Sequence, residues 1–376
     1  MVNKTRLIKL TQKLIQIDSQ NPPGNESAIA LFVKGYLNSL GLEAKLYAFK
    51  KGRANIMAVL KGSSLKHSLL ITPHLDTVPA GRSWKRKPLA GSIEKNRIYG
   101  LGATDCKGNL ACALEAINSL IDDKVVLGYN LVFAATADEE SGSGLGLIPL
   151  LNKGILRPDA AVILDADDFQ IIITQKGLIH LKVKIQGKRA HGAYPDRGIN
   201  AIDIAMDIIR QVKIMFSRLH YVKNRYLKPP TVNVGTIRGG DKVNIVADWC
   251  EFELDLRYLP GDSAPSLLRA IKGIIRKEAK KFAIEEESVQ APYFINETHP
   301  LIKHLNNVMK KNRVRPSIEG SEGATVITFF QEKNIPAVAT GFGSGGCAHM
   351  ADEYVKINNL YKGAIVLEEF LKNYKF

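Results

Sequence analysis

The chain opens with apolar residues spaced three and four positions apart, which is the period of an amphipathic helix. This spacing predicts a helix over residues 5–17, whose apolar face carries Leu7, Leu10, Leu14 and Ile17. The turn Asn21-Pro22-Pro23-Gly24 separates it from the next element. Asn25 is predicted to cap a second helix that runs to about Leu40 and ends at Gly41.

Short apolar runs of strand length come next, each bounded by Gly, Pro, Asp or Lys. They cover residues 55–60, 69–71, 129–136 and 160–164. Residues 110–120 have a helical pattern between two of these runs, which predicts a βαβ unit. We therefore expect an α/β sheet with buried strands.

The pattern changes near Lys176-Gly177, where residues 178–186 alternate between apolar and polar as a half-exposed strand does. A helix is predicted next, then two strands and a Lys-rich helix, at residues 200–216, 231–237, 250–258 and 263–282. This β-α-β-β-α order predicts a small α+β domain inserted into the first domain. After Pro292 the pattern is mixed and ends in an amphipathic helix over residues 360–374. The predicted limits are 1–177 and 289–376 for the first domain and 178–288 for the insertion.

The composition is that of a globular protein, with 45% hydrophobic residues among 376. Fifty-two Lys and Arg against 37 Asp and Glu give a net charge of +15, which favours an acidic partner: a nucleic acid, an anionic membrane surface or a carboxylate-bearing substrate. No apolar run is long enough to predict a transmembrane helix. Four scattered cysteines indicate a reducing compartment, so we expect a cytoplasmic protein.

Residues with catalytic potential come after the predicted strands. His74 and Asp76 lie directly after the run 69–71, and side chains two apart in an extended segment project to the same side. The carboxylate can then orient the imidazole, as is usual behind a metal-bound histidine. By itself the triplet equally fits a histidine at the end of a strand.

Two acidic segments can also be interpreted as either functional or structural. Asp105 lies in the glycine-rich loop 100–108, where it is either an exposed ligand or a helix cap; the loop lacks a phosphate-binding motif. Asp138, Glu139 and Glu140 end the run 129–136, and a bound cation would relieve their mutual repulsion. The alternative for these three acids is a solvated acidic loop.

Asp165 ends a further apolar run, and His349 comes after the glycine-rich loop 343–346. Because such segments meet at one edge of an α/β sheet, we expect two histidines and at least four carboxylates to converge there. Mixed imidazole and carboxylate ligands suit zinc, cobalt or manganese. The number of ligands predicts two metal ions that share one carboxylate.

Four segments together resemble the motifs of the dinuclear zinc amidohydrolases, the family of acetylornithine deacetylase, succinyl-diaminopimelate desuccinylase, aminoacylase, glutamate carboxypeptidase and related dipeptidases. They occur in the family's order, and are His74-Leu75-Asp76-Thr77-Val78-Pro79, the loop 100–108 around Asp105, Asp138-Glu139-Glu140-x-Gly142-Ser143, and Ala348-His349-x-x-Asp352-Glu353-Tyr354. The resemblance implies a mixed-sheet, zinc-peptidase-like catalytic domain with an inserted ferredoxin-like lid and dimerisation domain.

The resemblance also implies a role for each residue. Asp105 would bridge two divalent metal ions, His74 and Asp165 would complete one site, and Glu140 and His349 the other. Glu139 would be the general base that moves a proton from the attacking water to the leaving amine, and Asp76 would orient His74.

In the insertion, His191 matches a family histidine that reaches the partner subunit's site and stabilises the oxyanion. Arg257 matches an arginine that grips the substrate carboxylate, although an ordinary surface ion pair also fits it. Asn244 and Gly323 would help to hold the substrate. The implied protein is a homodimer that acts on a small carboxylate-bearing amide, with no nucleic-acid or membrane partner.

Two departures from the family pattern affect the predicted substrate. Asp165 stands where deacylases generally carry Glu and where the di- and carboxypeptidases carry Asp. Residues 321–325 replace the commoner Gly-Gly-Thr-Asp of the substrate loop. We predict a deacylase for N-acyl amino acids, with a dipeptidase or carboxypeptidase as the alternative.

Two other function classes stay open at this point. Cys106 and Cys347 could be thiol nucleophiles, soft extra ligands, oxidation-sensitive thiols or packing residues, although nearby acids oppose thiolate formation. Basic clusters at 82–97 and 272–281 would suit a nucleic-acid-binding protein that is not an enzyme, but no aromatic interleaving or recognition motif accompanies them. Given the family resemblance, capture of a small carboxylate-bearing substrate explains the +15 charge better than a nucleic-acid partner does.

Overall fold

The computed structural model describes residues 1–219, 224–323 and 325–376. The chain forms two compact units. Unit 1 comprises residues 1–173, 295–319 and 329–376, and unit 2 comprises residues 174–294 and 320–328. The limits expected for the folding domains, 1–177, 178–288 and 289–376, stay a prediction. Among the described residues, no helix is long and apolar enough to cross a membrane.

The larger sheet is mixed and has the strand order β1-β2-β6-β3-β7-β15-β8-β13, with β14 also paired to β8. Its bounds are β1 (Lys45–Lys50), β2 (Arg53–Leu60), β3 (Ser68–Thr72), β6 (Asn130–Ala135), β7 (Ala160–Leu164), β8 (Gln170–Gln175), β13 (Tyr293–Phe294), β14 (Ser317–Ser321) and β15 (Ala337–Thr340). The central strands β6, β3, β7 and β15 pair in parallel. Because both faces of β7 are covered, all five of its residues are buried.

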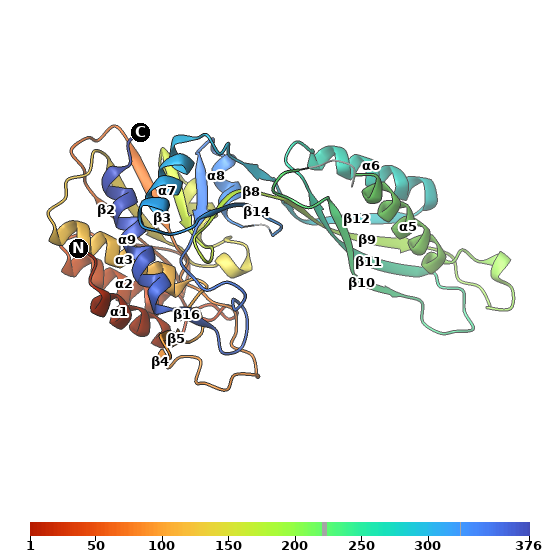
Figure 1. The fold of residues 1–376 in the computed structure, drawn as a ribbon. Helices are drawn as coiled ribbons and strands as arrows, with labels where there is room; N and C mark the ends of the chain where they lie inside the picture. The colour runs from red at the N-terminus through yellow and green to blue at the C-terminus, as the bar shows by residue number, and fades with distance from the viewer. Residues whose placement is uncertain (220–223, 324) are drawn as a thin grey trace. The chain divides into compact units, whose positions relative to one another are not determined.

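Three helices of unit 1 lie side by side against one another: α1 (Lys4–Gln16), α3 (Lys107–Asp122) and α9 (Ile357–Asn373) (Figure 1). The α3 helix is buried from Lys107 to Leu120, as expected of a helix between a sheet and a second helix layer. The other helices that include residues of this unit are α2 (Ser27–Ser39), α4 (Leu147–Asn152), α7 (Pro300–Lys311) and α8 (Ile327–Gln331). A small sheet joins β4 (Ser92–Glu94), β5 (Arg97–Tyr99) and β16 (Tyr354–Lys356).

Unit 2 is a four-stranded antiparallel sheet with two helices packed on one face (Figure 1). In chain order its elements are β9 (Gly177–Gln186), α5 (Ala201–Leu219), β10 (Thr231–Gly239), β11 (Trp249–Tyr258), α6 (Ala264–Glu278) and β12 (Phe282–Gln290). The strand order β10-β11-β9-β12 is that of a ferredoxin-like fold. Alternate residues of β9 and β11 are buried beneath the helices, which confirms the half-exposed strand expected over residues 178–186 and the strand expected over residues 250–258.

Two local predictions were wrong, and one strand was missed. Asn25 does not cap α2: Glu26 occupies that position without a side-chain capping bond, because its carboxylate binds Arg53. The Lys-rich helix ends at Glu278, because Ala279 is extended. Phe282 instead begins β12, a strand that was not predicted, since three consecutive acids and a register shift near Glu286 interrupt its alternation.

Candidate dinuclear metal centre

Three parallel strands bring most of the centre together. His74 lies two residues beyond the end of β3, Asp165 comes directly after β7, and Glu139 and Glu140 form a short 3₁₀ turn after β6. Because neighbouring parallel strands end at the same edge of a sheet, the segments after them meet there. Main-chain bonds hold the ends in place, from Leu75 N to the Thr136 carbonyl and from Asp165 N to the Thr340 carbonyl.

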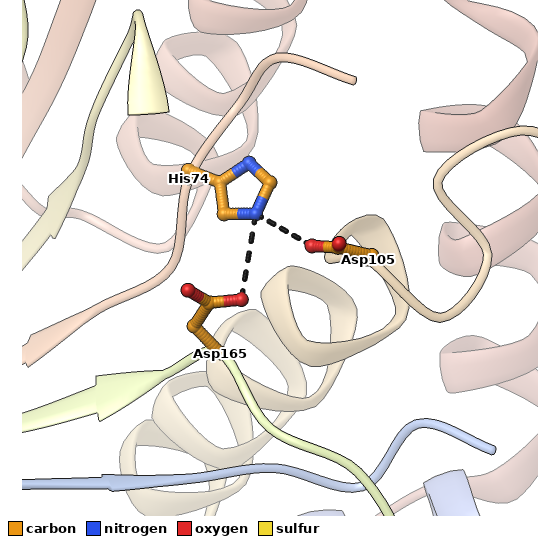
Figure 2. A group of neighbouring side chains, drawn as sticks. All are labelled: His74, Asp105 and Asp165. Atoms are coloured by element: carbon orange, nitrogen blue, oxygen red, sulfur yellow. Dashed lines mark hydrogen bonds and ion pairs between the residues drawn. The ribbon is translucent and has the colours of Figure 1, made fainter. Parts of the chain in front are cut away.

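The first cluster contains His74, Asp105 and Asp165, whose side chains point toward one another (Figure 2). The His74 Nε2 atom lies 2.8 Å from Asp105 Oδ1 and 3.6 Å from Asp165 Oδ1. His74 is buried, whereas the two carboxylates are partly exposed. The other ring nitrogen, Nδ1, lies 3.0 Å from the main-chain oxygen of Asp76, so that Nδ1 has its own acceptor and Nε2 is the nitrogen that faces the two carboxylates.

The second cluster contains Glu140 and His349 together with the other oxygen of the same aspartate. His349 Nε2 lies 3.1 Å from Asp105 Oδ2 and 3.1 Å from Glu140 Oε2. Asp105 therefore presents one carboxylate oxygen to each cluster, the arrangement required of a carboxylate that bridges two ions. His349 is held at a positive φ of 59° in the loop between β15 and β16.

The donor set fits divalent metal ions. In each cluster one imidazole nitrogen and two carboxylate oxygens lie within 4.8 Å of one another. Imidazole and carboxylate ligands of this kind suit zinc and manganese, and cobalt by similarity. The second nitrogen of His74 has its own acceptor, as metal-binding histidines usually do.

Asp76 is fully buried and links several parts of the centre. One of its oxygens lies 3.7 Å from His74 Nδ1, and its two oxygens accept the main-chain N–H groups of Glu139 and Glu140, each at 3.1 Å. Burial raises the pKa of Asp76, but the neighbouring His74 and the hydrogen bonds outweigh it, so that the pKa is lowered. The Asp76 carboxylate is therefore ionised and fixes the turn as well as the histidine.

The protonation of the other groups depends on burial and close charges. Burial, and then the Asp165 charge, raise the pKa of Glu139 well above its usual range. Hydrogen bonds to Asp105 and Glu140 raise the pKa of His349 to about 10. Burial opposes ionisation of Asp105, but hydrogen bonds from His349 and His74 lower its pKa overall. These shifts indicate a concentration of negative charge that two cations would balance.

A buried ion network supports the 3₁₀ turn from behind. Arg53 binds both oxygens of Glu26 and donates to Asp138 Oδ1 at 2.7 Å. Asn21 donates to Asp76 Oδ2 at 2.9 Å, so the segment predicted only as a helix break also supports the centre. Asn21, Arg53 and Glu26 were not predicted as site residues, since no local spacing marks them.

The two cysteines near the centre are buried thiols. Burial raises the pKa of Cys106 to about 12, and its sulfur lies between the main-chain N–H and carbonyl of His74. Burial also raises the pKa of Cys347, whose thiol donates to the Ser344 carbonyl at 2.9 Å. Protonated, buried thiols are poor nucleophiles, which argues against the thiol-nucleophile hypothesis.

Two predicted site residues of unit 2 lie next to each other. His191 and Ile245 form an isolated bridge, and Gly192 N donates to the Asn244 carbonyl at 2.8 Å. A Cβ on Gly192 would meet the Asn244 main chain at 2.9 Å, so this close contact requires glycine. The structure therefore brings His191 and Asn244 together on two adjoining loops.

Arg257 forms the ion pair that the sequence left as an alternative. Its guanidinium donates to both oxygens of Asp255, at 2.7 and 3.0 Å, and His180 approaches the same carboxylate at 3.3 Å. Arg257 remains partly exposed on the sheet face opposite the helices. A substrate carboxylate at Arg257 would therefore compete with Asp255.

Gly323 lies in a segment anchored by β8 and the residue after it. Gln175 binds Thr325 through both ends of its amide, and the buried Lys176 ammonium pairs with Glu322 at 2.6 Å. Ser321 donates to the Gly323 carbonyl at 3.2 Å. Ala324, part of the same predicted loop, lies outside the described residues.

The basic stretch 82–97 takes part in contacts within unit 1. Arg86 binds Glu94 and approaches Asp352, and its guanidinium stacks 4.0 Å above the ring of Tyr99. Arg97 lies over Tyr354 at 4.1 Å. These contacts account for two of the charges that prompted the nucleic-acid hypothesis.

Comparison with known proteins identifies the family. The profile of peptidase family M20/M25/M40 matches residues 70–373, which include both clusters of candidate ligands. The chain belongs to this family. The predicted family, its mixed α/β fold and its class, an enzyme that hydrolyses amide bonds, are thereby confirmed.

Individual relatives agree with this family. The acetylornithine deacetylase of Edwardsiella ictaluri is 29% identical over 382 residues, which cover 98% of this chain and 96% of the relative. The structure of aminopeptidase PepT from Bacillus cereus has a TM-score of 0.82 at 22% identity and covers 99% of this chain and 98% of its own. An M20 family metallo-carboxypeptidase from Sulfolobus solfataricus has a TM-score of 0.80 at 23% identity, over 97% and 98% of the two chains. At these identities the two structures show the shared fold.

Proposed function

We propose that this family member hydrolyses the amide bond of an N-acyl amino acid with the help of two divalent metal ions, zinc before cobalt or manganese. The observation that carries the proposal is Asp105, which lies with Oδ1 toward His74 and Oδ2 toward His349. His74 and Asp165 would complete one ion's ligands, and Glu140 and His349 the other's.

In this proposal the metal ions and the protein side chains have different roles in the reaction. The ions, when bound, supply a lowered pKa for water and a polarised scissile carbonyl. Glu139 takes the proton of the attacking water and passes it to the leaving amine, a role open to a carboxylate that lies beside both clusters and belongs to neither. Asp76 keeps both His74 and the Glu139–Glu140 turn in place.

Unit 2 supplies the remaining groups in this proposal. His191, from the partner subunit, stabilises the oxyanion of the tetrahedral intermediate, and Arg257 binds the substrate carboxylate. Asn244 and the segment around Gly323 hold the rest of the substrate. The support is the hydrogen bond from Gly192, next to His191, to the Asn244 carbonyl, and the anchoring of Glu322 and Thr325 by Lys176 and Gln175.

We further propose that the chain forms a homodimer through unit 2. β10 is an edge strand of its sheet, and the neighbouring helix α5 exposes Met206 and Ile214, at 53% and 42%. Open edges and exposed apolar side chains favour association with another copy. Light scattering of the purified protein tests this, and a Met206→Lys variant should shift the equilibrium toward the monomer.

The experiment that tests the function is a substrate panel with controlled metal. Protein stripped with a chelator is assayed on N-acetyl and N-succinyl amino acids and on dipeptides, before and after addition of Zn²⁺, Co²⁺ or Mn²⁺. We expect hydrolysis of an N-acyl amino acid that the chelator abolishes and metal restores. Full activity in chelator would overturn the proposal. Preferential cleavage of dipeptides would favour the alternative, a dipeptidase or carboxypeptidase, which Asp165 supports.

A matched pair of substrates tests the role of Arg257. The Arg257→Ala variant should raise the KM for an N-acyl amino acid more than for its carboxamide, since only the acid offers a carboxylate. Arg269→Ala, at an exposed arginine of α6, is the control. An equal effect of Arg257→Ala on both substrates would contradict carboxylate binding there.

A further inference from the structure

Glu353 is a buried carboxylate close to the metal ligands that the proposed mechanism does not use. It lies four residues after His349, and 1% of its surface is exposed. Its two oxygens accept three main-chain N–H groups: Oε2 accepts Gly102 N at 2.8 Å, and Oε1 accepts Thr104 N at 2.8 Å and Asp105 N at 3.0 Å. The last of these donors belongs to the residue whose carboxylate faces both clusters.

Further contacts join the same two loops. Gly100 N donates to the Glu353 carbonyl at 2.9 Å, and Thr104 Oγ1 donates to the Tyr354 carbonyl at 2.7 Å. At Gly102, which has a φ of +76°, a Cβ would lie 2.6 Å from Thr77 Cγ2. The loop that carries Asp105 is thus packed on one side and bound to the Glu353 segment on the other.

We propose that Glu353 is a positioning residue for the bridging carboxylate: by binding the main chain at Gly102, Thr104 and Asp105, it aims Asp105 at both metal clusters. Each oxygen of Asp105 serves one cluster, so a rotation or shift of its main chain would change both at once. The inference deepens the proposed dinuclear centre and rests on it.

The chemistry of the three donors explains why a carboxylate is needed. An ionised carboxylate accepts at both oxygens, whereas the amide of glutamine has one acceptor and an NH₂ group that only donates. In a Glu353→Gln variant at least one loop N–H would face a donor instead of an acceptor. A buried N–H without an acceptor is costly, so the loop would move to find one.

The neighbouring acid provides a matched control. Asp352 accepts Lys85 N at 3.1 Å and Arg86 N at 2.9 Å through a single oxygen, Oδ1, and its φ is +59°. Asparagine keeps one acceptor oxygen and tolerates this backbone conformation. Asp352→Asn therefore removes the same charge one residue away and leaves the main-chain hydrogen bonds intact.

The test is a stepwise Zn²⁺ titration of full-length, metal-free protein against a chromogenic chelator. For Glu353→Gln we expect both the first and the second dissociation constant to rise, by about 10- to 100-fold. Asp352→Asn should stay within about threefold of the wild type, since its main-chain hydrogen bonds survive and only the surface ion pair with Arg86 is lost. The proposal would be overturned if Glu353→Gln had the same two dissociation constants as the wild type. It would also be overturned if only one constant rose, because Glu353 would then act only on the loop that carries His349.

Two further measurements distinguish a failure of this proposal from misfolding of the variant and from a failure of the proposed dinuclear centre. If Glu353→Gln does not fold, Glu353→Asp takes its place, since it keeps both oxygens and is shorter by one methylene; weakening of both steps supports the proposal and unchanged constants overturn it. The wild-type titration tests the underlying centre by itself. Fewer than two bound ions in the wild type would mean that the proposed dinuclear centre fails, whatever the variants do.

Discussion

At the scale of single residues, Asp76 contacts three other residues of the centre. Its carboxylate is close to His74, and it accepts the main-chain N–H groups of Glu139 and Glu140. In the proposed centre it therefore sets a ligand of one ion, a ligand of the other, and the general base. An amide at this position would keep one acceptor and turn a donor toward the remaining groups.

We predict that Asp76→Asn weakens metal binding by about 10- to 100-fold, the usual effect of losing a group that orients a ligand. Zinc titration of the metal-free protein measures this. Asp168→Asn is the control, because Asp168 is exposed and binds Asn359 and Gly345 N outside the two clusters. Equal affinities for Asp76→Asn and the wild type would contradict the role given to Asp76.

Glu139→Gln should separate catalysis from metal binding. Among the described residues Glu139 belongs to neither ligand cluster, so both ions should remain bound. Loss of a general base costs about 10²- to 10⁴-fold in rate. Parallel measurement of metal content and kcat checks this, and a variant with full metal content and unreduced kcat would disprove the proton-transfer role.

The sequence predicts the candidate ligands at the strand ends better than it predicts the residues that hold these ligands in place by hydrogen bonds. His74, Asp105 and Glu140 stand out because each comes after a predicted strand or opens a helix and fits a family motif. Glu353 was part of a motif but received no role. Its contacts span 248 to 251 positions, and no local period or spacing reveals which main-chain donors such a distant carboxylate will meet.

At the scale of elements, local periodicity predicted the existence of most helices and strands, but not every end. The helical apolar period of α6 continues up to Ile275. Beyond Glu278 the chain becomes extended because β12 pairs with β9, a strand about 100 positions earlier in the sequence. The alternation of β12 is broken by Glu285, Glu286 and Glu287, of which Glu285 binds Lys184 on the neighbouring strand. A cross-strand ion pair of this kind becomes visible only in the folded sheet.

Two substitutions in α6 should have opposite effects on the stability of unit 2. Ile271 is fully buried in the core between the helices and the sheet, so Ile271→Ala should destabilise by about 2–5 kcal/mol. Gly273, two residues later, is exposed and a Cβ there would meet nothing within 4 Å. Gly273→Ala should therefore stabilise by about 0.5–1 kcal/mol.

Urea denaturation monitored by circular dichroism measures both changes, and each variant serves as the other's control. If Gly273→Ala lowered the midpoint, the helical assignment of that exposed position would be wrong. If Ile271→Ala left the midpoint unchanged, the core of unit 2 would not lie where the structure has it.

At the scale of the whole molecule, the charge of +15 can be linked to the proposed substrate. A positive field increases the rate of encounter with an anion, and salt screens it. We predict that kcat/KM for an N-acyl amino acid falls between low and physiological ionic strength, and that kcat/KM for its carboxamide changes less. The same salt dependence for both substrates would show that the charge does not act on the substrate carboxylate.

The central claim is that Asp105 joins two metal sites into one centre, and metal content tests it most directly. Wild-type protein saturated with Zn²⁺ and freed of excess metal should retain two ions per chain. Asp105→Asn should lose affinity for both, because one charged oxygen is replaced by an NH₂ group and the other by a neutral, weaker amide oxygen. Asp168→Asn, the same change at an exposed acid outside the two clusters, should retain two and controls for the loss of a carboxylate. Fewer than two ions in the wild type, or two ions bound by Asp105→Asn with unchanged affinity, would contradict the account.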